Sequence, residues 1–291
     1  MAEIIQKDGT WTFDGDTVRI VPGGDKGVSL LRRALGEVAV PLDALAGVSF
    51  EAGRKSGRLR LRLRDGADPL LQTTGGKLDE ASDPYRLSVS GDRAGVAEYF
   101  VDEVRNALLL EQVAAGPTDR YLLPGPALPL TIGAGDGTVT FDGERIRLEW
   151  NWKTEESKSA GGPRTLGLAD VDAVEWLPAA GLENGYLRFR TAHSSAPAFS
   201  GPAKYDPHAV ELWGFRRDPL MALVAAAVVA RLPHPHAVRK ELAPPPAAAL
   251  PPAADHDVLL RRLRELGELH QAGVLTDDEF TAAKQAVLKQ L

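Results

Sequence analysis

The sequence predicts a mainly β fold with α-helices: two tandem domains of short antiparallel strands, each ending in a helix, and then a two-helix hairpin. Three observations lead to this class. One pattern of alternating polar and apolar residues occurs twice, each copy ends in a helical pattern, and a proline-rich stretch precedes a last helical pattern. The predicted domains cover residues 1–112 and 128–232, the linker covers 233–256, and the hairpin covers 257–291.

Each copy of the repeat opens with a β-hairpin around an Asp-Gly turn. Residues 9–20 alternate around Asp14-Gly15, and residues 137–148 alternate around Asp142-Gly143. Further blocks then match in the same order: 42–50 with 168–176, 57–62 with 185–190, and 83–89 with 206–212. Because order and spacing are both kept, we expect one domain used twice.

Both copies end in an apolar pattern of helical spacing, from Val96 to Leu108 and from Leu220 to Val228. An antiparallel sheet must cover its apolar face, and a terminal helix does so. The stretch Leu220–Leu232 is the most apolar of the chain, but it is shorter than the roughly 20 residues of a membrane span. We therefore expect a buried helix there.

Composition excludes several functions. The net charge of −6 argues against general binding of nucleic acid or of an anionic membrane. The sequence has no cysteine, which excludes disulfides, thiolate zinc sites and a cysteine nucleophile. No secretory signal is visible at the amino terminus, so a cytoplasmic protein is expected. No nucleotide, metal or hydrolase motif is found, and no cofactor is expected.

The linker is rich in proline and alanine and is expected to be a semi-rigid spacer. The two short helices after it bury too little surface to be stable alone, so they should pair with another copy or with a partner protein. Gly273 ends the first helix, and a capping box at Thr276 and Glu279 starts the second. The predicted self-association face consists of Leu259, Leu263, Leu266, Leu269, Phe280, Val287 and Leu288.

The carboxy-terminal string Leu263–Phe280, with Gly-Val-Leu-Thr at its centre, resembles the SHOCT domain, a short helical module of bacterial proteins. This resemblance implies oligomerisation or partner contact and no catalysis. The duplicated unit resembles the pleckstrin-homology-like (PH-like) domains of bacteria through its Phe-Asp-Gly hairpin and its Gly-Tyr-Leu-Arg-Phe strand. The whole layout is similar to an uncharacterised actinobacterial family with two such domains of unknown function before SHOCT. That resemblance supplies no activity.

Strand arginines are the main candidate ligand site. They alternate with apolar residues and so share one strand face in each copy. Two interpretations remain open: an anion-binding face for phosphate, or a solvated face paired with carboxylates across the sheet. The candidate anion face is Arg58, Arg60, Arg62, Arg188 and Arg190.

Two tryptophans, Trp150 and Trp152, are predicted on one strand face, where they either stack on a ligand or cover a β-domain core. His234 and His236 lie in the linker without a third ligand at metal-binding spacing. The sequence therefore favours a non-enzymatic scaffold whose hairpin binds itself or a protein partner. The alternative is a sensor whose PH-like domain holds an anionic lipid or a small metabolite; membrane lipid is not favoured.

Overall fold

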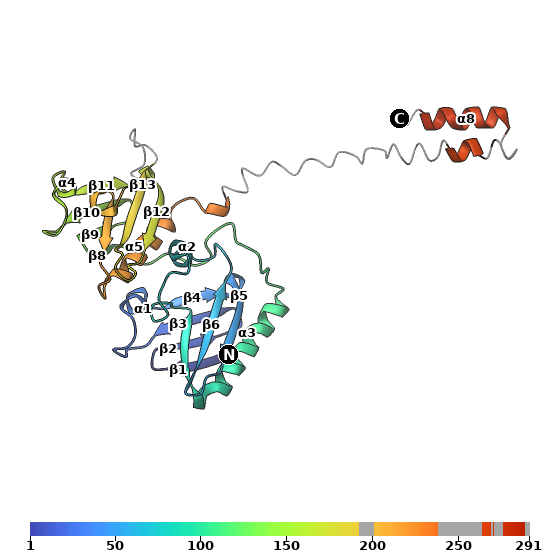
Figure 1. Cartoon of the computed structure of the whole chain (residues 1–291). Helices are drawn as coiled ribbons and strands as arrows, with labels where there is room; N and C mark the ends of the chain where they lie inside the picture. The colour runs from blue at the N-terminus through green and yellow to red at the C-terminus, as the bar shows by residue number, and fades with distance from the viewer. Residues whose placement is uncertain (192–200, 238–263, 269, 271–275, 289–291) are drawn as a thin grey trace. The chain divides into compact units, whose positions relative to one another are not determined.

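The computed structural model describes residues 1–191, 201–237, 264–268, 270 and 276–288 (Figure 1). The chain divides into two compact units, Met1–Val238 and Arg239–Leu291. Four antiparallel sheets lie in two β-rich regions of the first unit, and the second unit is helical where it is described. The predicted fold class, mainly β repeats followed by a helical segment, is confirmed.

The first repeat contains a four-stranded sheet, a three-stranded sheet and a closing helix. The first sheet has the order β1-β2-β3-β4 and the second the order β5-β6-β7. Their strands are β1 (Ala2–Gln6), β2 (Gly9–Phe13), β3 (Thr17–Pro22), β4 (Val38–Pro41), β5 (Leu45–Glu51), β6 (Ser56–Leu63) and β7 (Arg86–Ser90). The helices are α1 (Leu30–Leu35), α2 (Pro69–Thr74) and α3 (Ala94–Leu110), with 3-10 turns η1 (Leu42–Ala44) and η2 (Gly91–Arg93).

The second repeat has the same plan, with sheets of order β11-β10-β9-β8 and β12-β13-β14. Its strands are β8 (Leu130–Ala134), β9 (Gly137–Phe141), β10 (Arg145–Trp150), β11 (Arg164–Gly167), β12 (Val171–Leu177), β13 (Gly185–Thr191) and β14 (Ala209–Leu212). Its helices are α4 (Glu156–Ser159) and α5 (Met221–Val229), with η3 (Leu168–Asp170), η4 (Ala203–Tyr205) and η5 (Asp218–Leu220).

The Asp-Gly turns are built identically in the two repeats. Asp14 Oδ1 accepts the backbone N–H of Thr17 at 2.8 Å, and Asp142 Oδ1 accepts that of Arg145 at 2.7 Å. The glycine after each aspartate has φ of +119° or +114°, a region that favours glycine. These backbone hydrogen bonds stabilise the charged form and lower the pKa of both carboxyl groups.

Helix α5 is buried on every side, whereas a helix covering a single sheet would bury only one face. All residues from Met221 to Val228 are buried. The reason is a second neighbour: Leu70 of α2 and Leu31 of α1, both from the first repeat, belong to the same apolar core as α5. The core of the second repeat therefore extends to α1 and α2 of the first repeat, which also has a core of its own.

The chain also returns to the first repeat directly after α5. The Nε2 atom of His234 lies 3.0 Å from the carbonyl oxygen of Gly66, and its ring packs edge-on against Tyr121 at 4.6 Å. The Nδ1 atom of His236 lies 2.8 Å from the carbonyl oxygen of Thr118. The start of the predicted linker is thus bound to the first repeat, and both imidazole rings are used in this contact.

The second unit contains helical residues 264–268 and α8 (Asp277–Leu288). The predicted capping box is present: Glu279 N–H donates to Thr276 Oγ1 at 3.4 Å, and Thr276 N–H donates to Glu279 Oε2 at 3.0 Å. None of the described residues after 263 is fully buried. Within the described part of the chain, no helix has the length and apolarity to cross a membrane.

We predict that Gly66→Ala destabilises the first unit more than Gly76→Ala, by about 1–3 kcal/mol. Both glycines have a positive φ, +79° and +76°, so both substitutions carry the same backbone strain. Only at Gly66 would a Cβ meet a neighbour, since His234 Cε1 would lie 2.9 Å away, whereas nothing lies within 4 Å at Gly76. Urea unfolding of the full chain, followed by tryptophan fluorescence, measures the difference.

Adding His234→Ala to Gly66→Ala should remove part of this excess, because the clashing ring is then absent, whereas the carbonyl oxygen of Thr118, 3.0 Å from the same Cβ position, remains. Equal losses for the two single alanine variants would contradict the contact between His234 and the first repeat.

Candidate functional site

The predicted arginine face of the first repeat lies on β6. Arg58 is 3.5 Å from Glu80 and forms an ion pair with it. Among the described residues, Arg60 and Arg62 have no carboxylate at ion-pair distance, and both line a small hollow of about 310 Å³. Arg62 donates to the carbonyl oxygen of Ala46 at 3.4 Å. The structure therefore brings Arg60 and Arg62 together as exposed cations.

The matching arginines of the second repeat are neutralised. Arg188 is buried, lies 2.8 Å from Asp206, and donates to the carbonyl oxygen of Gly201 at 2.7 Å. Arg190 lies 2.5 Å from Glu175, across the sheet. This geometry corresponds to the second interpretation, a face paired with carboxylates, so the two repeats do not form equivalent anion faces.

The predicted self-association face is described only in part. Leu266 lies in the first helical segment, and Phe280 and Val287 lie on α8; all three are half-buried. Leu288 belongs to α8, but its side chain lies outside the description. The other members lie outside the described residues: Leu259, Leu263 and Leu269.

The two predicted strand tryptophans have different surroundings. Strand β10 ends at Trp150, which packs against the core and donates Nε1–H to the carbonyl oxygen of Gly162 at 2.9 Å. Trp152 lies beyond the strand and is 88% exposed. The Lys153 ammonium lies 5.2 Å from the ring centres of both Trp152 and Trp213. Thus Trp150 covers the core, and Trp152 belongs to an exposed aromatic group.

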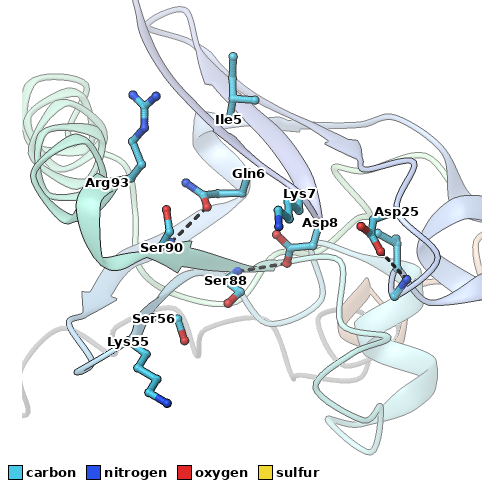
Figure 2. A pocket seen from close by; sticks show the side chains of 12 residues that line it. Ile5, Gln6, Lys7, Asp8, Asp25, Lys55, Ser56, Ser88, Ser90 and Arg93 are labelled. Atoms are coloured by element: carbon cyan, nitrogen blue, oxygen red, sulfur yellow. Dashed lines mark hydrogen bonds between the residues drawn. The ribbon is translucent and has the colours of Figure 1, made fainter.

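A larger hollow, of about 800 Å³, lies at one end of the first repeat (Figure 2). Its wall combines the β1–β2 turn, the β3–α1 connection, the start of β6, β7 and the residue before α3. In the view of Figure 2, Arg93 lies on one side of the serines of β7 and Lys55 on the other, each with its charged end directed away from them, while Lys7 lies beside Asp8 and Asp25 lies at the opposite end. Five separate segments thus bring cations and hydroxyl groups together.

The two carboxylates of this hollow are already engaged. Asp8 accepts from the N–H of Ser88 at 3.2 Å and pairs with Arg32, whose Nη1 lies 3.4 Å away. Asp25 accepts the N–H of Gly27 at 2.8 Å. Among the described residues, none of the three cations in this hollow has a carboxylate at ion-pair distance. Asp25 keeps its negative charge, since a backbone N–H does not cancel it, but the three cations outnumber it and the net charge of the hollow is positive.

The aspartate bridge recurs in the second repeat with a different cation. Asp136 Oδ1 accepts the N–H of Glu211 at 2.8 Å, as Asp8 does from β7, and its Oδ2 lies 2.6 Å from the ammonium of Lys158. Both members of this pair are fully buried. Burial raises the pKa of the Asp136 carboxyl, and the Lys158 ammonium acts against that rise.

Strand register identifies the counterparts of the hollow in the second repeat. Gly57 pairs with Val89 in the first repeat, and Gly185 pairs with Leu212 at the same place in the second. In the other sheet, the pair Gln6 and Gly9 corresponds to the pair Ala134 and Gly137. The counterparts of Lys7, Lys55, Ser88 and Ser90 are therefore Gly135, Glu183, Glu211 and Trp213. At these four positions the cations and hydroxyls of the first repeat are replaced by glycine, carboxylates and an indole, whereas the counterpart of Arg93 is another cation, Arg216.

Sequence reasoning did not find this hollow because its residues come from separate turns with no motif spacing. One signal was present in the aligned repeats: Lys55 stands opposite Glu183, and Ser88 opposite Glu211, at otherwise matched positions. Charge reversal between copies marks a position that the fold does not constrain.

A second cavity, of about 340 Å³, contains the buried carboxyl of Asp68 and the hydroxyl of Tyr85. Burial raises the pKa of both groups. Asp68 caps α2 by accepting the N–H groups of Leu70 and Leu71 at 3.1 Å, and it accepts the Tyr85 hydroxyl at 2.8 Å. These bonds hold the start of α2 and leave the carboxyl a structural role.

Comparison with protein families matches the chain twice to the domain of unknown function DUF4429, over residues 11–105 and 139–229. The short C-terminal domain SHOCT matches residues 261–288. Together the two DUF4429 matches cover more than half of the chain, so the chain belongs to this family. Among curated proteins, no relative matches the chain. The resemblance to SHOCT and the tandem domains of unknown function are confirmed.

We predict that Asp136→Asn costs about 3–5 kcal/mol of unfolding free energy, because it leaves Lys158 buried without a counter-charge. Asp8→Asn, the same change in the first repeat, should cost much less, since the Asp8 side chain is 28% exposed and its cation is more distant. Urea unfolding of the full-length variants measures both losses.

The double variant Asp136→Asn/Lys158→Met should recover part of the loss, because no unpaired charge then remains in the core. Equal losses of unfolding free energy for Asp136→Asn and Asp8→Asn would show that the buried pair of the second repeat stabilises the fold no more than the partly exposed pair of the first.

Proposed function

We propose that this member of the DUF4429 family is a non-enzymatic scaffold protein whose SHOCT segment joins copies of the chain. The observation that carries the proposal is the state of this segment: its second helix is capped, yet none of its described residues is fully buried. Two short helices without a core of their own are marginally stable in water. Pairing with the same segment of another copy would supply the missing contact.

The apolar face of α8 supports this pairing. Phe280 and Val287 are seven residues apart and so lie on the same side of the helix. Phe280 stacks on the ring of His270 at 4.6 Å, and His270 Nε2 lies 2.7 Å from the Asp277 carboxylate. These contacts link the two helical segments and leave the apolar side of α8 half-buried. The alternative to a second copy on this face is a partner protein with a complementary helix.

The interpretation of each repeat as a PH-like domain belongs to this proposal. A four-stranded sheet, a three-stranded sheet and a terminal helix follow one another in both repeats, which supports that assignment. The polar residues that the repeats share also support a non-enzymatic role. Asp14 and Asp142 build turns, and Asp8 and Asp136 bridge the two sheets, so these shared carboxylates serve the fold.

We expect the full chain to be at least dimeric at micromolar concentration and Phe280→Asp/Val287→Asp to be monomeric. Two carboxylates in an apolar interface carry a desolvation cost that the unpaired chain avoids. Size-exclusion chromatography with light scattering gives the molar mass of both. The matched control is Ala282→Asp/Ala286→Asp, which places the same two residues on the exposed side of α8 and should stay dimeric.

A monomeric wild-type chain under these conditions would contradict self-association. Dissociation by both double variants would point instead to loss of helix α8.

A further inference from the structure

We propose that the hollow of the first repeat binds a phosphate group, carried by a soluble metabolite or by a lipid headgroup, and that the matching end of the second repeat does not. This site is independent of the helical hairpin and of the scaffold function. It also differs from the arginine face of β6, which lies elsewhere on the repeat.

Uncompensated charge is the first argument. Lys7, Lys55 and Arg93 line one hollow, and among the described residues none of them has a carboxylate at ion-pair distance. The whole chain carries a net charge of −6, so a local group of three unpaired cations stands out from its surroundings. Three positive groups outnumber Asp25, the carboxylate of this wall that forms no ion pair with a described residue, so the local field attracts an anion.

The origin of the donors in separate segments is the second argument. The cations come from three different segments, the β1–β2 turn, the end of the β5–β6 turn and the residue before α3. Among the described residues, the hydroxyl groups of Ser56 and Ser88 have no hydrogen-bond partner. A tetrahedral phosphate accepts from donors on several sides, whereas a carboxylate accepts in one plane. The arrangement therefore suits phosphate.

The shape of the hollow indicates how the phosphate is carried. The hollow is open, and its volume of about 800 Å³ leaves room beside a phosphate group for a larger organic part. Ile5, which is 64% exposed, gives the hollow an apolar side. A phosphomonoester with a larger organic part satisfies both features.

The second repeat provides the internal comparison. Its fold is the same and its aspartate bridge is kept, yet Glu183 and Glu211 stand where the first repeat has Lys55 and Ser88. Two carboxylates at these positions repel phosphate. The backbone thus tolerates either set of residues, and only the first repeat has the set that attracts an anion.

The test uses the full chain and titrates inorganic pyrophosphate by isothermal calorimetry, with acetate at equal ionic strength as the second anion. The variant Lys55→Glu/Ser88→Glu carries the counterpart residues of the second repeat, which that fold already accommodates. We expect it to weaken pyrophosphate binding by at least about tenfold, the value of one charged hydrogen bond. Acetate should not bind measurably.

Arg60→Glu/Arg62→Glu is the matched control, because it removes more positive charge from the neighbouring sheet face without touching the hollow. It should leave pyrophosphate affinity within about twofold of wild type, a change smaller than that of one hydrogen bond. If this control abolishes binding and the hollow variant does not, or if wild type binds no pyrophosphate, the proposal is wrong. Lys55→Gln/Arg93→Gln repeats the test should the first variant unfold.

Flotation with phosphatidylcholine vesicles, with and without phosphatidic acid, separates the two sources of phosphate. Flotation that needs phosphatidic acid and is lost in Lys55→Glu/Ser88→Glu assigns a lipid headgroup. Pyrophosphate binding without flotation assigns a soluble phosphomonoester. Flotation that survives in this variant would place lipid binding outside the hollow and contradict the lipid form of the proposal.

Discussion

One carboxylate in each repeat ties together the parts of the fold that the sheets alone leave apart. Asp8 lies between β1 and β2, accepts an N–H of β7 and pairs with a cation of α1. In the same way, Asp136 connects the β8–β9 turn with β14 and with α4. β1 and β7 are edge strands of different sheets, and the Ser88 N–H of β7, which Asp8 accepts, would otherwise have no partner. This bridge thus adds a polar contact between two sheets that the apolar core also holds together.

The bridge also explains why the two repeats differ at this end. In the second repeat the cation is Lys158, completely buried and 4.6 Å from the centre of the Trp150 ring, so the bridge is sealed from water. In the first repeat the Arg32 guanidinium is buried, but Asp8 stays partly exposed on the wall of a hollow. The same structural solution is closed in one copy and open in the other, so Asp8 lies on the wall of a hollow whereas Asp136 is sealed in the core.

The local sequence pattern predicted the strands and helices, but it did not predict the contacts between them. Alternation around Asp14-Gly15 and Asp142-Gly143 gave both hairpins, because a turn is decided by its own residues. The apolar stretch of α5 predicted a buried helix, but no periodicity says that α2 of the other repeat covers its far side. The hollow was not predicted from the sequence for the same reason, because its residues meet only when five separate segments are folded.

Sharing α5 has a consequence for the whole chain. A helix buried on all sides cannot be exposed without loss of apolar contact, so the two repeats act as one unit and not as independent modules. Each chain then presents the hollow of the first repeat together with its helical carboxy-terminal segment. If that segment pairs two copies, two hollows belong to one assembly, and a surface that carries many phosphates is bound by both. The second binding step is then intramolecular, so avidity for such a surface exceeds affinity for a single phosphate without any new contact.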